Sequence, residues 1–330
     1  MSVKKEDYLY LSSLLRAREI HMLSRDRAER MLDAPNYEDC AKLLAECGYE
    51  DMSGFTIKQI EDSLSAHRAE VFHELEGLIP DVGALDLFRL KYDYHNVKVL
   101  IKAEAQNRDD SSLLSESAKV EPEVLLKRMR EEKLRDLPGQ LGHAAEEARA
   151  LLARSGNPQL ADFLLDKAYF AQLHEIAEDL DSDFARGYVE VLADATNLRS
   201  AVRIQRMGKD IGYLREALVP GGSVSEERVV AGLTSEGLAA VYAGGPLEKA
   251  AQLGADAVSG GLLTQFELAC DNAVAGYLSD ARRASFGDEC VLGYLAGMES
   301  ELTAARMILT GRLAGVPSDT VRERLRDLYA

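Results

Sequence analysis

Three acidic residues with matching neighbours are the strongest candidates for chemistry in this chain. Asp93, Asp194 and Glu301 are 101 and 107 residues apart (194 − 93 and 301 − 194), close to a third of the 330 residues each time. Asn follows the first two acids at the third position and a base follows all three at the fifth, giving Asn96, Asn197, Lys98, Arg199 and Arg306. Such a set can form hydrogen bonds and ion pairs within the fold or contact another protein of a complex. Catalysis is not indicated, because no nucleophile or general base stands beside these residues.

The residues around each acid predict one long helix three times. Apolar residues recur at offsets −6, −3, +1, +4 and +8 from each acid, and alternating steps of three and four mark the buried face of an α-helix. The base at +5 is about 140° from the acid around the helix, so the two cannot pair within it. We therefore expect the charged members to pair with residues on neighbouring helices, and to be structural first and interface residues second.

The chain is predicted to contain three copies of one helical domain. Polar and Pro- or Gly-containing stretches break it near Arg108–Ser112 and Val219–Gly222. Alternation of the strand type is missing. The expected fold is all-α, with three homologous domains over residues 1–110, 111–215 and 216–330. A period near a hundred residues is too long for short helical repeat arrays.

Several helix ends can be placed from the sequence. Residues 8–30 carry apolar residues at helical spacing as one run. Asn36 is a candidate N-cap for a helix starting at Tyr37. Thr56 and Gln59 fit a capping box. A last helix is expected over residues 318–329, capped by Ser318.

Composition excludes several classes of partner. The net charge of −17 would repel nucleic-acid phosphates and anionic lipid headgroups alike. No apolar run approaches the roughly 18–20 residues that span a bilayer, and the N-terminus lacks the apolar core of a signal peptide. We expect a cytoplasmic protein that does not insert into lipid. The four cysteines have no zinc or redox spacing, so free thiols are expected.

No motif for a cofactor, metal or nucleotide is present. The glycine pairs are neither followed by Gly-Lys-Ser/Thr nor spaced as a dinucleotide-binding loop. The acidic run Asp179–Asp183 resembles the start of a calcium loop, but Phe184 stands where the sharp turn needs Gly. We therefore expect no catalytic residue, no cofactor, no metal and no bound nucleotide.

Several segments in order resemble a known family. They are Leu90–Lys98, Asp194–Arg199, Phe286–Glu289 leading into Glu299–Leu309, and Gly311–Pro317. Together they are similar to the C subunit of the archaeal and bacterial A/V-type ATPases, the counterpart of the d subunit of the eukaryotic V-ATPases. The third copy departs from the pattern, with Glu301 for Asp, Ala304 for Asn, and Thr310 where the others have Lys102 and Arg203.

The resemblance implies a rotor component without catalytic activity. Members of the family consist of three related helical domains arranged as a funnel around a pseudo-threefold axis. One end rests on the membrane proteolipid ring, and the central-stalk subunits of D and F type insert into the other. Such a component transmits torque for coupled ion transport, hydrogen ions included, and ATP synthesis or hydrolysis. It is peripherally membrane-associated through the complex.

Two other interpretations remain from the residues. A free-standing helical scaffold could use the same three copies to bind another protein partner. An all-α metal hydrolase could use the scattered Asp and His side chains, in which case the purified chain would carry a tightly bound metal.

Overall fold

The computed structural model describes residues 3–235 and 237–329, and this part of the chain is built from helices without a β-strand. The all-α prediction is confirmed. Contacts divide the chain into two compact units, Met1–Leu85 with Leu262–Ala330, and Asp86–Gly261.

The first unit combines the two ends of the chain. Its helices are the 3₁₀-helices η1 (Lys5–Tyr8) and η4 (Asp280–Arg283), and α1 (Leu9–Glu19), α2 (Arg25–Asp33), α3 (Tyr37–Ala45), α4 (Ile57–Glu76), α14 (Leu263–Ser279), α15 (Asp288–Leu313) and α16 (Ser318–Arg322).

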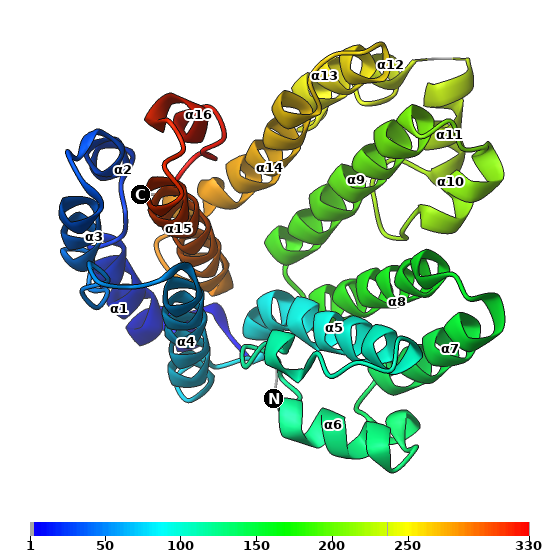
Figure 1. Cartoon of the computed structure of the whole chain (residues 1–330), viewed down its shortest axis with the longest axis horizontal. Coiled ribbons are helices and arrows are strands. Elements are labelled where there is room, and N and C mark those ends of the chain that lie inside the picture. The colour runs from blue at the N-terminus through cyan, green and yellow to red at the C-terminus, as the bar shows by residue number, and fades with distance from the viewer. Residues whose placement is uncertain (1–2, 236, 330) are drawn as a thin grey trace. The chain divides into compact units, whose positions relative to one another are not determined.

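Helix α15 is the centre of this unit. Its apolar residues are buried along almost its whole length, from Cys290 to Leu309. The N-terminal helices α1, α2, α3 and α4 pack against it, as do α14 and α16. Figure 1 shows α15 and α16, in red, beside the blue N-terminal helices. The last long helix is therefore covered by the N-terminal part of the chain.

The second unit begins within the long helix α5 (Gly83–Ala105). It continues with η2 (Ser111–Leu113), α6 (Pro122–Arg130), η3 (Leu134–Asp136), α7 (Gln140–Ser155), α8 (Pro158–Asp179), α9 (Asp183–Arg206), α10 (Ile211–Ala217), α11 (Glu226–Thr234), α12 (Leu238–Val241) and α13 (Glu248–Val258).

The long helices α5, α8 and α9 organise the second unit. Helix α5 runs antiparallel to α8, because Lys98 contacts Asp166 while Lys102, further along α5, contacts the earlier Asp162. Helix α8 also packs closely on α7. Helix α9 contacts α8, α10, α11 and α13, so α9, like α15, packs against several other helices.

Several predicted helix ends are confirmed. The Asn36 side chain accepts a hydrogen bond from Asp39 N at the start of α3, and Thr56 and Gln59 form the expected capping box of α4. Ser318 is different: its hydroxyl donates to Leu32 O at 2.8 Å and does not cap α16, which ends at Arg322 and not near Tyr329.

The run over residues 8–30 was expected as one helix, and that expectation is wrong. It is two helices, α1 and α2, separated by Ile20–Ser24. Ser24 ends the gap by capping α2, where its hydroxyl accepts from Arg27 N at 3.3 Å. The gap leaves the backbone N–H of Leu23 outside both helices. A buried donor of this kind needs a partner from elsewhere in the fold.

The boundaries predicted at residues 110 and 215 both fall inside the second unit. The division into three homologous domains therefore stays a prediction. All four cysteines are free thiols, and only Cys47 is partly accessible. Among the described residues, no helix combines the length and the apolar character needed to cross a lipid bilayer.

Candidate functional site

The acid of the second copy, Asp194, holds the loop that follows α10. It lies buried in the middle of α9, where its carboxylate accepts hydrogen bonds from Ser223 N at 3.1 Å, Ser223 Oγ at 2.5 Å and Val224 N at 3.1 Å. The loop passes so closely that a Cβ on Gly222 would overlap the Asp194 carboxylate. Glycine is therefore required there by space and not by backbone conformation.

The acid of the first copy makes the same kind of contact. Asp93, buried in α5, accepts from Val120 N at 2.8 Å. The neighbouring Lys119 contacts Asp86, about two turns earlier on α5, at 2.5 Å. The segment before α6 is thus fixed to α5 through one backbone group and one ion pair.

The two asparagines hold the same loops a few residues earlier. Asn96 donates to Ser115 O at 2.9 Å and accepts from Ser115 N at 2.7 Å. Asn197 does the same to Val219, at 2.9 and 2.8 Å. An amide side chain presents one donor and one acceptor side by side, so it can satisfy both backbone groups of one extended residue.

Helices α5 and α9 agree in the spacing of these contacts. The residues held by the asparagine and the acid are five apart in both cases, since 120 − 115 and 224 − 219 are equal. Two equivalent side chains on each helix therefore hold two equivalent points of the following segment.

The third acid of the predicted set contacts a residue near the start of the chain. Glu301, buried in α15, accepts from Leu23 N at 3.0 Å. Ala304 stands where the other copies have Asn. The equivalent of Ser115 and Val219, five residues before Leu23, is Arg18, which belongs to helix α1. Its backbone groups are satisfied within the helix, so this copy needs no amide there.

Burial changes the acidity of all three acids. It raises the pKa of Asp93 to about 6 and that of Glu301 to about 7, and it also raises the pKa of Asp194. In each case the backbone N–H groups that donate to the carboxylate act in the opposite direction but do not cancel the loss of water.

The bases of the predicted set point to neighbouring helices and not to the acids. Lys98 contacts Asp166 on α8 at 2.5 Å, and Arg306 contacts Glu61 on α4 at 2.6 Å. Arg199 also has an interaction partner. Neighbouring acids were the partners expected for the bases. The acids differ from expectation, because their partners are backbone N–H groups and a hydroxyl.

The structure thus brings each acid together with a connecting segment and not with the base that follows it in sequence. Sequence patterns missed the segment partners Leu23, Ser115, Val120, Val219 and Ser223. Every residue type carries the same backbone groups, so the sequence does not reveal which of them bind the acids. The Gly221–Gly222 pair alone signals that the backbone passes close to another group.

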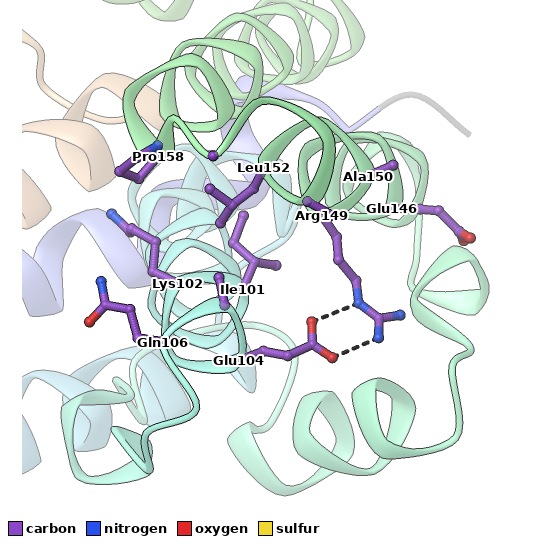
Figure 2. Close-up of a pocket in the computed structure, with 12 residues that line it drawn as sticks. Ile101, Lys102, Glu104, Gln106, Glu146, Arg149, Ala150, Leu152 and Pro158 are labelled. Carbon is purple, nitrogen blue, oxygen red and sulfur yellow. Dashed lines mark hydrogen bonds and ion pairs between the residues drawn. The ribbon is translucent and has the colours of Figure 1, made fainter.

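A separate cavity of about 730 Å³ lies between the end of α5, α7 and the start of α8. Figure 2 shows its apolar residues Ile101 and Leu152 beside an ion pair between Glu104 and Arg149, whose two hydrogen bonds are 2.6 and 2.7 Å long. The cavity contains none of the acids of the predicted set, and the Glu104 carboxylate is neutralised by Arg149. It offers room for an apolar side chain but no arrangement for acid–base or nucleophilic chemistry.

No cluster of three His, Cys, Asp or Glu side chains suited to a metal occurs in residues 3–235 and 237–329. The structural roles found for the acids and amides agree with their positions on buried helix faces. The bases Lys98, Arg199 and Arg306 are the partly exposed members of the predicted set.

Comparison with known proteins identifies the group to which this architecture belongs. The family model described as ATP synthase (C/AC39) subunit matches residues 11–324. The C subunit of the V-type sodium ATPase of Enterococcus hirae is 23% identical over 98% of this chain and 99% of its own length. The C subunit of the A-type ATP synthase of Pyrococcus abyssi is 21% identical over 98% and 92%.

A third relative matches part of the chain more closely. The C subunit of the V-type ATP synthase of Thermus thermophilus is 26% identical over 62% of this chain and 65% of its own length. Since the family model spans nearly the whole sequence, the chain belongs to the ATP synthase (C/AC39) subunit family of V-type and A-type ATPases.

Proposed function

We propose that this chain is the non-catalytic central-stalk subunit of a rotary ATPase or ATP synthase. It links the central-stalk subunits, of D and F type, to the membrane proteolipid ring and transmits torque between them. The observation that carries the proposal is the family match over residues 11–324, combined with relatives named as the C subunits of V-type and A-type ATPases.

The internal contacts suit a part that carries load. A torque-bearing protein must resist shear between its helices and the segments that connect them. In this chain, buried side chains of α5, α9 and α15 hold the segments at Val120, Val224 and Leu23. A backbone donor that loses its acceptor inside the fold is costly, so these joints resist separation and favour rigid coupling.

We also propose an arrangement of the domains and a location for the protein. Three homologous domains over residues 1–110, 111–215 and 216–330 form the funnel, which stays in the cytoplasm at the membrane surface through its protein partners. Contacts with those partners use exposed groups, because Asp93, Asp194 and Glu301 are buried. Among the predicted residues, the half-exposed bases are the candidates for such contacts.

Binding to both partners tests the proposal. The purified chain is mixed with the central-stalk subcomplex and with the detergent-solubilised proteolipid ring of the same ATPase. We expect the stalk and ring to co-elute in its presence and to separate in its absence, and we expect the chain alone to hydrolyse no ATP. Failure to bind either partner would favour the free-standing scaffold, and ATP hydrolysis by the chain would reject a non-catalytic role.

A further inference from the structure

Glu301 occupies the joint between the two ends of the chain. It lies on α15, whereas its partner Leu23 lies in the gap between α1 and α2, 278 residues earlier. Whatever changes the state of this carboxyl therefore acts on the packing of the N-terminal helices against the last long helix. The equivalent contacts of Asp93 and Asp194 span only 27 to 30 residues.

Glu301 has fewer hydrogen-bond donors than Asp194. Asp194 receives three hydrogen bonds, and Asp93 is close enough to Arg89 for its carboxylate to be stabilised. In the described part of the chain, the Glu301 carboxyl accepts from Leu23 N and forms no ion pair. An ionised carboxylate that is buried with so few donors is costly, whereas the neutral acid fits such a place.

The groups that could favour a charge on Glu301 do so only weakly. Arg27 lies near enough to stabilise the carboxylate, but its Nη1 is 3.2 Å from Cys47 Sγ. The Tyr49 hydroxyl also favours the charge, yet burial outweighs it. The balance therefore leaves the neutral form of the carboxyl favoured up to about neutral pH.

The other cations near Glu301 are directed to other groups. Arg68 lies 3.3 Å from Glu299, and Arg18 pairs with Glu74. The remaining titratable groups that line the cavity beside the joint are His21, His67, Glu70 and Tyr294. Among these groups, the glutamates Glu70 and Glu74 also line the cavity, and Glu74 is paired with Arg18.

Solvent can reach the joint without unfolding. A cavity of about 310 Å³ is lined by Glu301 together with Met22, Tyr49, His67 and Met298. A proton can therefore exchange between the carboxyl and water in the folded protein.

We propose that Glu301 is a proton-sensitive latch that joins α15 to the turn after α1, closed when the carboxyl is neutral and loosened when it is ionised. The neutral acid keeps a carbonyl oxygen that accepts from Leu23 N and leaves no charge in the joint. Loss of the proton places a buried charge there, which the Leu23 N–H and Arg27 stabilise less than water would, so hydration of the carboxylate through the cavity and separation of Leu23 from α15 become favourable.

The acidity of the group places this change in the physiological range. Burial raises the pKa of Glu301 to about 7 from its ordinary value of 4.5. Because the folded pKa is above the unfolded one, the stabilising contribution is complete below about pH 4.5 and is lost as the pH rises through 7. The latch therefore opens toward the alkaline side of neutrality.

Amide hydrogen exchange of Leu23 in the full chain tests the latch. We expect its protection factor, corrected for intrinsic exchange, to fall about tenfold or more between pH 6 and pH 8. In E301Q, whose amide oxygen still accepts but cannot ionise, protection should stay constant over that range. E323Q removes an exposed carboxylate from the same unit and should behave as the unmodified chain does. An equal fall in E301Q, or no fall in the unmodified chain, would overturn the proposal.

A second measurement does not depend on the folding of E301Q. The carboxyl carbons of a chain labelled with ¹³C in its glutamates are titrated by NMR. One resonance with a midpoint near 7 supports the latch, and midpoints below 5 for every glutamate reject it.

Discussion

The backbone N–H of Leu23 lies 3.0 Å from Glu301 Oε1, so a residue of the first helical gap is fixed to the last long helix. The break between α1 and α2 frees a backbone donor, and the buried acid on α15 supplies its acceptor. A continuous helix would leave no free N–H at Leu23, and an apolar residue at position 301 would leave that N–H unsatisfied.

The same relationship recurs with different partners. Asp93 holds Val120 and Asp194 holds Val224, each belonging to a segment that follows the helix carrying the acid. Glu301 uses the start of the chain instead.

Replacing Asp194 should destabilise the protein strongly. Asp194→Ala removes the acceptor of Ser223 N, Ser223 Oγ and Val224 N, and we expect a loss of about 2–4 kcal/mol in the free energy of unfolding. Asp194→Asn keeps an acceptor and should cost less. Urea unfolding followed by circular dichroism measures both. If Asp194→Ala unfolded normally but failed to support coupling in the assembled ATPase, Asp194 would belong to an interface.

Gly222 should tolerate no side chain. In Gly222→Ala the new Cβ meets the Asp194 carboxylate, and we expect a cost of about 1–3 kcal/mol from the displaced loop. Gly276→Ala, within α14 and with open space around it, is the control. It should be neutral or stabilise by up to about 1 kcal/mol, because alanine favours a helix. Equal effects of the two changes in thermal melting would contradict the close approach.

The asparagine of the second copy and the alanine of the third should not be interchangeable. Asn197→Ala removes both hydrogen bonds to Val219 and should cost about 1–3 kcal/mol. Ala304→Asn should also destabilise, because Ala304 is buried and the α1 backbone at Arg18 has no free group to receive the amide. A stabilising Ala304→Asn in denaturant unfolding would show that this interpretation of the third copy is wrong.

Asp93 should make stability depend on pH. Burial raises the pKa of Asp93 to about 6, above its ordinary value of 3.8, so its contribution is complete below that ordinary value and is lost as the pH rises through 6. Asp93→Asn should therefore flatten the decline in unfolding free energy between pH 4 and pH 7 by about 1–3 kcal/mol. Denaturant unfolding at four or five pH values checks this, and an unchanged slope would argue against a protonated Asp93.

Much of the fold could be predicted from the sequence because helix signals are local. The apolar spacing around Asp93, Asp194 and Glu301 identified the three long helices α5, α9 and α15. Asn36 and Thr56 marked helix starts because a cap acts within three residues of itself. The run over residues 8–30 failed for the opposite reason. Its apolar spacing continues across the break, and the acceptor of the freed Leu23 N–H is a carboxylate 278 residues away.

The candidate residues were found, but the partners of the acids were not. Repetition singled out the acids and asparagines, and their buried positions follow from the helix period. Their partners are backbone groups, which every residue carries, so no spacing could point to Val120 or Val224. The bases were easier to interpret, since acids such as Asp166 and Glu61 have side chains that the sequence shows.

The most direct test of the proposed function is coupling in a reconstituted rotary ATPase. The complex is assembled in vesicles with and without this chain, and ATP hydrolysis and ion transport are measured together. We predict that hydrolysis by the catalytic head persists without the chain while ATP-driven ion transport is lost, and that adding the chain restores transport. Full transport in its absence would contradict its role as the link between stalk and ring.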